Sequence, residues 1–431
     1  MSALLNSIVP AAIAYTIPLL MGALGGLYSE RSGVTNLCIE GLMLMGCFVC
    51  AVVMTLLEGT VSGLALLAAG LAAAVFFTAV YSILHAVASI NLKADQTISG
   101  TAINMLSTAL TVYLARALTN SGNITIHGVV PASIEEFLPA GFHNLLWSVL
   151  AVVLVCLLLS WIVKLATGGK KKASVTSGLV YWILEAAVLA LVLSLFLPEM
   201  AASLIAAALV AADSLVLRKK GLFASVPVLK TGNSADSRDS AFAAVMIIIA
   251  GLISVPGFGS FFRNLLFRRV YWTTVVCLLI WGASYFLLYK TSFGLRLRAC
   301  GEHPSAVASA GVNVYKMRYI GVIASGALAG LGGAVYLITV GGEFNSASGM
   351  NGLGFLAIAG LIFGQWKPLG ILGSTFFFGF CYTMANMSRI VPALSFIPAG
   401  IFSAFPYVAT LIVLIFTSKR NAAPLASGVP Y

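Results

Sequence analysis

Two polar stretches lie within long apolar runs of the chain, and their side chains are the ones that could do chemistry there. The first stretch holds Asn36 and Glu40, and the second holds Asp95, Gln96 and Asn104. Carboxylates and amides in an apolar setting need hydrogen-bond partners, which can come from the protein or from a polar solute. An ionised carboxylate within a membrane span costs roughly 2.5 kcal/mol or more, so it normally faces a polar cavity or a partner.

Each of these residues also has a purely structural interpretation. Glu40 could form an ion pair with Arg31, or it could lie near the membrane interface. Asp95 can cap the helix that begins near Thr97, and a cap is a sufficient explanation for this carboxylate. Asn104 lies about two turns deeper, and its amide requires partners from a neighbouring helix or from a polar solute.

A third polar stretch is a basic segment of 23 residues, from Arg296 to Arg318, between two apolar runs. Pro304 can open a short helix at its first position, and Gly311 can close that helix about two turns later. Asn313 can then cap the helix that begins at Val314. A short, rigid helix of Ala and Ser at a membrane surface is suited to fill a groove on another protein.

The chain lacks the motifs of several enzyme classes. It contains no G-x-x-x-x-G-K-[ST] phosphate-binding loop, no H-E-x-x-H and no G-x-S-x-G, and its histidines are isolated from one another (His85, His127, His143 and His303). We therefore assign no catalytic residue, no metal site and no cofactor to this chain, and we expect it not to be an enzyme.

The composition is that of a protein with many membrane-spanning helices. Of 431 residues, 60% are hydrophobic and only 9% are charged, against about 25% charged in ordinary soluble domains. The net charge of +11 comes from clusters between apolar runs, which suits an anionic membrane surface. A nucleic-acid partner is excluded because no soluble domain is large enough to carry a basic binding face.

The apolar runs predict thirteen spans. A span needs about 20 apolar residues, and the run at 354–365 is short and rich in glycine, which is typical of a broken or tilted span. The excess of Lys and Arg places 290–318 on the inner side, together with Lys93 and Lys367. The runs cover about 8–27, 37–57, 62–90, 98–118, 143–163, 179–197, 199–217, 240–256, 271–289, 319–340, 354–365, 369–388 and 399–417.

The order of spans and loops indicates three parts. Residues 143–255 form an accessory membrane block of four helices, inserted between an N-terminal half of the core (1–142) and a C-terminal half (256–431). A weak internal similarity relates 24–37 to 331–353, and the two copies cross in opposite directions, as expected of an inverted repeat.

Three pairs of glycines with the spacing Gly-x-x-x-Gly are expected to pack helices closely. They are Gly22 and Gly26, Gly326 and Gly330, and Gly360 and Gly364.

Four stretches of the chain resemble one family of membrane proteins. They are residues 25–43, 92–104, 293–333 and 354–370, and together with their surroundings they cover about two thirds of the chain. They resemble the permeases of the ribose and simple-sugar (branched-chain-type) ABC importers, in particular the bacterial nucleoside-uptake branch. The resemblance implies an all-α transmembrane bundle, the type II importer permease fold, in the bacterial inner membrane.

The resemblance also implies a set of partners and site residues. The partners are an ABC ATPase subunit that binds ATP and Mg²⁺, a second permease subunit in a heterodimer, and an extracytoplasmic substrate-binding protein. The coupling helix and ATPase interface would lie at about 302–312 and include Glu302, His303, Pro304, Ser305, Ala306, Ser309 and Gly311. The translocation path would be lined or supported by Asn36, Glu40, Asp95, Gln96 and Asn104.

Three other functions remain open on the sequence. The first is transport of a simple sugar such as ribose in place of a nucleoside. The second is an ion-coupled secondary transporter, which would need paired acids in the membrane, with Glu40 and Asp95 as the candidate pair. The third is a non-transporting scaffold or intramembrane enzyme, which the missing catalytic motifs disfavour.

Overall fold

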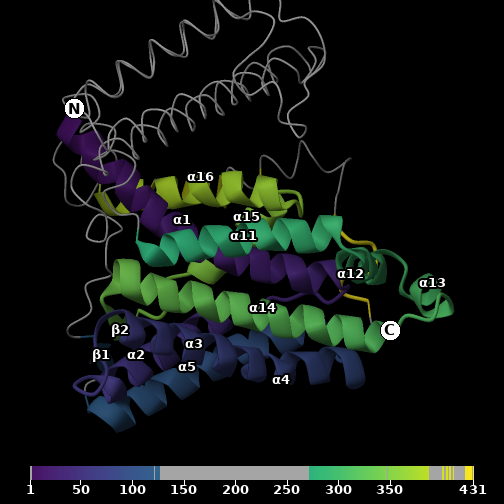
Figure 1. Ribbon diagram of the computed structural model, residues 1–431, viewed down its shortest axis with the longest axis horizontal. Helices are drawn as coiled ribbons and strands as arrows, with labels where there is room; N and C mark the ends of the chain where they lie inside the picture. Colours follow the sequence, from purple (N-terminus) through teal and green to yellow (C-terminus); the bar gives the residue numbers. More distant parts are fainter. Residues whose placement is uncertain are drawn as a thin grey trace, which may run out of the picture. The chain divides into compact units, whose positions relative to one another are not determined.

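The computed structural model describes residues 2–120, 122–126, 271–346, 348–387, 423–429 and 431, together with 400, 401, 404, 405, 407, 408 and 411 (Figure 1). The chain divides into two compact units, Met1–Pro10 with Ser133–Arg268 and Ala11–Ala132 with Arg269–Tyr431. The description below concerns the second unit. The inserted block that we expect at 143–255 lies outside the described residues.

The described part is built almost entirely of helices. Seven of them are long and apolar enough to cross a membrane, and they begin and end close to the spans that the sequence predicts. The run at 354–365 forms the short helix α15 (Leu353–Phe363), and most of the run at 399–417 lies outside the described residues. The other elements are α1 (Ser2–Arg31), α2 (Ile39–Leu57), α3 (Gly63–Tyr81), α4 (Ile83–Ala86), the π-helical turn Val87–Asn91, α5 (Gln96–Thr119), β1 (Asn123–Thr125), α11 (Trp272–Lys290), α12 (Ser292–Glu302), α13 (Pro304–Ser309), α14 (Val314–Tyr336), the π-helical turn Leu337–Gly341, β2 (Glu343–Asn345) and α16 (Pro368–Met387).

Helices α1, α2 and α14 form the centre of this unit. Within the most apolar stretch of each helix, the share of buried residues is 83% in α1 and 67% in α2 and α14. It is only 28% in α3, α5 and α11. Helix α14 packs against both α2 and α3. The outer helices therefore present most of their surface to the surroundings, where lipid or another subunit would cover it.

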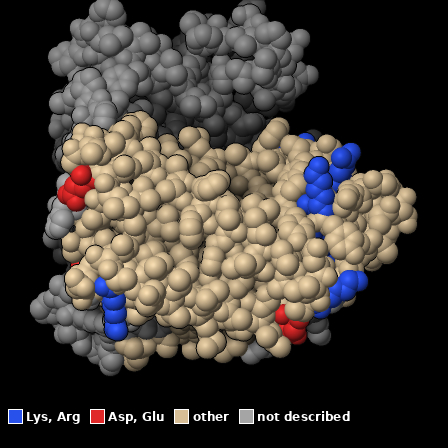
Figure 2. Space-filling view, turned by 90° about the horizontal axis from the view of Figure 1, so that it is seen from below, with Lys and Arg blue, Asp and Glu red and all other residues tan. Residues whose placement is uncertain are grey.

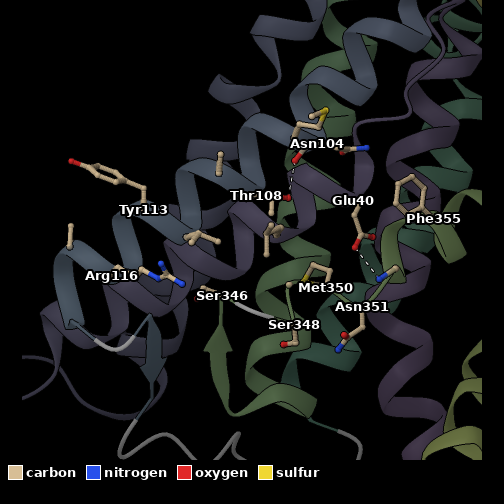
Figure 3. Close-up of a pocket in the computed structure, with 17 residues that line it drawn as sticks. Glu40, Asn104, Thr108, Tyr113, Arg116, Ser346, Ser348, Met350, Asn351 and Phe355 are labelled. Carbon is tan, nitrogen blue, oxygen red and sulfur yellow. Dashed lines mark hydrogen bonds between the residues drawn. The ribbon is translucent and has the colours of Figure 1, made fainter.

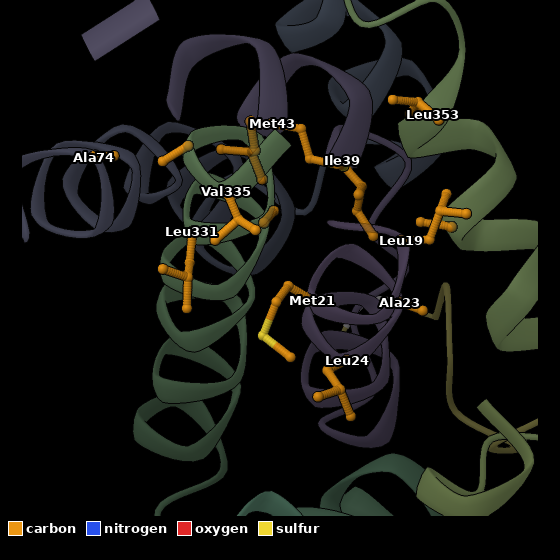
Figure 4. Close-up of a cluster of buried hydrophobic side chains, with 14 of the residues drawn as sticks. Leu19, Met21, Ala23, Leu24, Ile39, Met43, Ala74, Leu331, Val335 and Leu353 are labelled. Carbon is orange, nitrogen blue, oxygen red and sulfur yellow. The ribbon is translucent and has the colours of Figure 1, made fainter. Parts of the chain in front are cut away.

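The central core is a cluster of buried hydrophobic side chains, mainly from these three helices, which Ala74 of α3 and Leu353 of α15 join (Figure 4). Met21 of α1, Met43 of α2 and Leu331 of α14 are all at most 6% exposed. Lipid tails are as apolar as these side chains, so close van der Waals packing must hold the helices together.

Glycines permit that packing. A Cβ atom on Gly46 of α2 would lie within 2.7 Å of the Gly330 backbone of α14, and one on Gly333 would overlap the carbonyl oxygen of Met43. No side chain fits between backbones this close.

All six glycines singled out in the sequence also lie at contacts. Gly22 and Gly26 face Met43, Ile39, Ala357 and Leu361, Gly326 and Gly330 face Ser82 and Thr78, Gly360 faces Thr375, and Gly364 faces Ile371.

The two copies of the internal similarity lie on helices that run in opposite directions (Figure 1). Gly25 of α1 contacts the backbone of Ser325 in α14, and Gly332 of α14 contacts that of Pro18 in α1. A helix follows each of them after an irregular connection: α2 follows α1, and α15 follows α14 after the π-helical turn Leu337–Gly341 and strand β2.

A small antiparallel ribbon closes one end of the unit. Strands β1 and β2 pair in the register Asn123 to Asn345, Ile124 to Phe344 and Thr125 to Glu343. Phe344 is 1% exposed and its ring packs edge-on against Phe48 of α2, with the ring centroids 5.3 Å apart. The ribbon therefore joins the ends of α5 and α14.

Basic side chains gather at the opposite end, which also carries α12 and α13 (Figures 1 and 2). We call it the basic end. All Lys and Arg residues of the described part except Arg116 belong to it: Arg31, Lys93, Lys290, Arg296, Arg298, Lys316, Arg318 and Lys367. The excess of positive charge on inner loops predicts that this end is cytoplasmic.

The Gly46 contact predicts the effect of one added methyl group. Gly46→Ala should destabilise the protein by about 1–3 kcal/mol, because two helix backbones would have to separate. The midpoint of thermal unfolding in detergent, measured by loss of the monodisperse peak, should fall by about 3 °C or more.

Gly373→Ala in α16 is the matched control, since nothing lies within 4 Å of a Cβ placed there. It should unfold at the wild-type temperature or slightly above it, because Ala favours a helix. Equal midpoints for the two variants would contradict the proposed close contact.

Candidate functional site

Helix α2 begins inside the bundle, where its first backbone N–H groups need acceptors. Asn104 provides one, because its Oδ1 accepts from Gly41 N at 2.8 Å and its Nδ2 donates to the Leu37 carbonyl at 2.8 Å. Asn104 lies eight residues into α5, about 12 Å along that helix. A protein partner therefore satisfies the deep amide that the sequence left without an explanation.

Asn36 stabilises the chain just before the start of α2. Its Oδ1 accepts from Cys38 N at 3.0 Å, and its Nδ2 donates to Ser325 Oγ of α14 at 2.8 Å. The side chain is fully buried. Asn36 thus fixes the chain as it turns into α2 and ties that turn to α14.

Glu40, in the first turn of α2, caps another helix. Its two carboxylate oxygens accept from Gly352 N at 3.0 Å and from Gly354 N at 2.5 Å, at the start of α15. Gly352 adopts a φ of +79°, which suits glycine and few other residues. A carboxylate at a helix N-terminus is stabilised by the unpaired N–H groups and by the helix dipole.

This contact differs from the ion pair with Arg31, one of the two structural interpretations of Glu40 in the sequence. Arg31 pairs with Glu302 at 3.4 Å, so it is not the partner of Glu40. Glu40 is half-buried at the junction of α2 and α15, and its neighbour Asn104 lies about 12 Å along α5.

A cavity of about 1040 Å³ opens beside this junction (Figure 3). Its volume is at the upper end of the range of small-molecule pockets, about 300–1,000 Å³. Its walls come from α2, α5, the segment after β2 and the first turn of α15. It is lined by Glu40, Leu44, Asn104, Met105, Thr108, Ala109, Val112, Tyr113, Arg116, Ala117, Ser346, Ser348, Gly349, Met350, Asn351, Gly352 and Phe355.

The cavity combines rings with hydrogen-bonding groups. Phe355 is 49% exposed and Tyr113 is 71% exposed, so both rings are free to contact a solute. Amides and hydroxyls lie between them, contributed by Asn351, Ser348 and Thr108 among others. A small, neutral solute with a flat apolar face and several polar groups fits this lining.

The structure brings two of the five predicted path residues to the cavity, Glu40 and Asn104. The other three lie elsewhere. Asn36 is enclosed against α14, and Gln96 accepts from Thr35 N at 2.6 Å. Asp95 caps α5 by accepting from Ile98 N at 2.9 Å, as the sequence predicts.

Most of the cavity lining was not predicted. Asn104, Thr108 and Arg116 recur along one face of α5 at intervals of four and eight residues, and this helical period was the available signal. Ser348, Asn351 and Phe355 join them only through the fold, because they are more than 230 residues away in the sequence.

Helix α13 stands apart from the bundle at the basic end (Figure 1). As predicted, Pro304 is its first residue, Gly311 follows its end with a φ of +80°, and Asn313 caps α14 by accepting from Lys316 N at 2.9 Å. The preceding segment was not predicted to be helical, and it forms α12. The exposed residues here are His303, Ser305, Ala306, Ser309, Ala310 and Gly311, whereas Val307 is buried and Glu302, Pro304 and Ala308 are half-buried.

Contacts join the start of α13 to the core. Arg31, at the end of α1, pairs with Glu302 and also donates to the Trp366 carbonyl at 3.0 Å. The Trp366 indole donates to Glu30 at 2.5 Å. Trp366 lies in the turn after α15, so α1, α12 and the far end of α15 meet at one point.

No group of His, Cys, Asp or Glu within the described ranges is arranged to hold a metal ion. Nor do Glu40 and Asp95 form a pair there, since each carboxylate caps a different helix.

Comparison with known proteins places the chain among transport permeases. The family described as branched-chain amino acid transport system, permease component, matches residues 9–177 and 173–414. The chain is 33% identical to the guanosine ABC transporter permease protein NupQ of Bacillus subtilis, over 99% of this chain and 97% of that protein. It is 28% identical to the nucleoside ABC transporter permease protein NupC of Lactococcus lactis, over the same shares of the two chains.

Both alignments run through 143–255, so that block is not peculiar to this chain. A putative glucose ABC transporter permease protein of Haloferax volcanii is 31% identical over 41% of this chain and 58% of its own length. No solved structure matches the chain significantly.

Three observations agree with a membrane permease. They are the seven apolar helices, the projecting helix at the basic end and the match to the family over most of the chain. We conclude that this chain belongs to the family of branched-chain amino acid transport system permease components and is a multi-pass ABC transporter permease of the bacterial inner membrane.

Proposed function

We propose that this permease imports nucleosides, that the cavity between α2, α5 and α15 is part of their path, and that an ATPase subunit docks on α13. The observation that carries the proposal is the cavity itself, which joins exposed rings to amides and hydroxyls. The two full-length relatives are named as guanosine and nucleoside permeases, which supports this substrate class.

A nucleoside presents a flat base and a ribose with several hydroxyls. Phe355 and Tyr113 offer faces on which a base can stack, and stacking tolerates different bases because each has an aromatic face. Asn351, Ser348 and Thr108 offer donors and acceptors for the ribose or for the edge of the base. A path of this kind passes several nucleosides, and a binding protein then selects among them.

A second permease subunit would form the opposite wall of the path. Only 28% of the residues in the most apolar stretch of α5 are buried. Its mean hydropathy of 1.3 equals the lowest value among the seven spans. Its exposed face carries Thr101, Thr108 and Arg116, which suits a polar path between two subunits better than contact with lipid. We infer a heterodimer, to which an extracytoplasmic binding protein delivers the substrate.

ATP and Mg²⁺ would bind to a separate ATPase subunit, since this chain has no phosphate-binding loop. Closure of the ATPase dimer would displace α13, and the contacts of Glu302 with Arg31 and of Arg31 with Trp366 would pass the movement to α1 and α15. Because the other end of α15 rests on Glu40, the movement would reach the cavity. Access to the cavity would then alternate between the two sides of the membrane.

Replacing the ring of Phe355 tests the path. In cells that express the complete transporter, Phe355→Ala should lower the maximal rate of guanosine uptake about tenfold, because base stacking is worth about 1–3 kcal/mol. The half-saturating concentration should change less, since the binding protein sets it. Uptake of labelled guanosine at matched membrane levels measures both quantities.

Phe76→Ala is the matched control, because Phe76 is an exposed ring of α3 outside the cavity. It should leave uptake at the wild-type rate. Equal rates for both variants would remove the cavity from the path. Uptake of labelled ribose without uptake of labelled guanosine would make a simple sugar the substrate in place of nucleosides.

A bulky charge on α13 tests the docking of the ATPase. Ala306→Arg should prevent the ATPase subunit from co-purifying in mild detergent and should abolish uptake, because an arginine does not fit where a small residue enters a groove. Ala65→Arg is the control, since Ala65 is an exposed alanine in the first turn of α3, at the end opposite α13.

A wild-type preparation that is well folded but contains no ATPase would contradict this proposal. Uptake that continued after ATP depletion but ceased when the ion gradient was dissipated would indicate a secondary transporter instead.

A further inference from the structure

A segment near the C-terminus, residues 423–429 with Tyr431, lies at the basic end beside the junction of α12 and α13 (Figure 1). Ala426 N donates to the Gly301 carbonyl at 2.8 Å, and Leu425 N donates to the Glu302 carboxylate at 3.4 Å. Gly301 and Glu302 are the last two residues of α12. The segment is therefore attached within two residues of the start of α13.

Two further elements hold the same segment. The Ser427 and Thr35 hydroxyls are 3.0 Å apart, which ties the segment to the connection between α1 and α2. Arg318 of α14 donates from Nη1 to the Val429 carbonyl at 3.1 Å, and its guanidinium lies 5.7 Å from the centre of the Tyr431 ring.

Arg318 makes this attachment specific. It is 1% exposed, and its Nε and Nη2 have no hydrogen-bond partner in the part of the chain that the structure describes. A buried cation depends strongly on each acceptor that it has. Val429 supplies the one acceptor found for Arg318 there, so the segment occupies a defined place on the bundle.

The attached segment nevertheless presents apolar side chains outward. Leu425 is 71% exposed and Val429 is 53% exposed, and Tyr315 beside them is 43% exposed and packs against the Tyr431 ring at 5.4 Å. An isolated exposed leucine is ordinary, but here the apolar side chains stand on a backbone that several hydrogen bonds have ordered. Aromatic and aliphatic side chains held in this way are typical of the core of a protein interface.

Lipid does not fit this surface. The backbone of residues 423–429 is irregular, and irregular backbone is not found exposed to the hydrocarbon of a membrane because its polar groups would lack partners. The residues that border α13, close in sequence to the contacts at Gly301 and Glu302, include exposed polar ones, His303, Ser305 and Asn313. The surface therefore faces the aqueous side, next to the exposed face of α13.

We propose that residues 423–429 and Tyr431 form a second docking surface for the ATPase subunit, continuous with α13 and anchored by Leu425 and Val429. This inference rests on the proposed function, which puts the ATPase at this end. Contact here would let the ATPase hold α12, α14 and the connection between α1 and α2 together while it moves α13.

The test compares how fast the ATPase subunit leaves the immobilised full transporter in detergent. The double variant Leu425→Asp with Val429→Asp should release it about tenfold faster than wild type, as expected when a contact residue of an interface is lost. Ala306→Arg should retain none. Leu92→Asp is the matched control, because Leu92 is a 73% exposed leucine that follows the π-helical turn Val87–Asn91 and is not part of the segment, and it should behave as wild type.

The outcomes separate the two proposals. Release at the wild-type rate from the double variant, with loss of the ATPase from Ala306→Arg, would overturn the second surface and leave α13 as the docking site. Retention of the ATPase by both variants would overturn the proposed function as well. Deletion of residues 423–431 provides an independent arm and should match the double variant. A lower membrane level with an unchanged release rate would show that the segment only stabilises the fold.

Discussion

The structure depends on satisfying helix N-termini that begin inside an apolar bundle. Four N–H groups at the start of any helix lack a partner within the helix, and lipid offers none. Asn104 supplies an acceptor for α2, and Glu40 on the first turn of α2 supplies two for α15. The second cap depends on the first, because Asn104 fixes the turn of helix that carries Glu40.

These caps create the polar end of the cavity. A short helix such as α15, about 16 Å long, spans about half of a hydrocarbon core of about 30 Å, so one of its ends must lie at depth. That end needs polar neighbours, and the same neighbours line a space between α2 and α5. The hydrogen bonds that stabilise the buried start of α15 therefore come from polar groups that a polar solute in the cavity can also reach.

Close backbone packing makes the caps possible. Glu40 reaches the N–H groups of α15 because its own backbone lies against Gly354, and α2 is held against α14 at Gly46 and Gly333. The other end of α15 is held by Arg31 and Glu30 through Trp366, next to the helix pair α12 and α13. Helix α15 is thus fixed at the cavity by one end and near α13 by the other.

The sequence by itself determined the elements whose signals are local. Hydrophobic run lengths gave the spans of the described part, Asp95 and Asn313 gave helix starts, and Pro304 with Gly311 bounded α13, because each of these signals acts within one or two helical turns. Four stretches of the sequence, at 25–43, 92–104, 293–333 and 354–370, also resemble a permease family.

Only the tertiary structure decided what the polar residues do. Asn36, Glu40 and Asn104 are polar residues in apolar surroundings, and the sequence cannot distinguish a solute from a distant backbone as their partner. Glu40 meets Gly352 and Gly354 across more than 300 residues of chain, and Arg31 meets Glu302 across 271. Such pairings depend on how the helices pack, and that packing is set by the shapes of many side chains together and not by any local pattern.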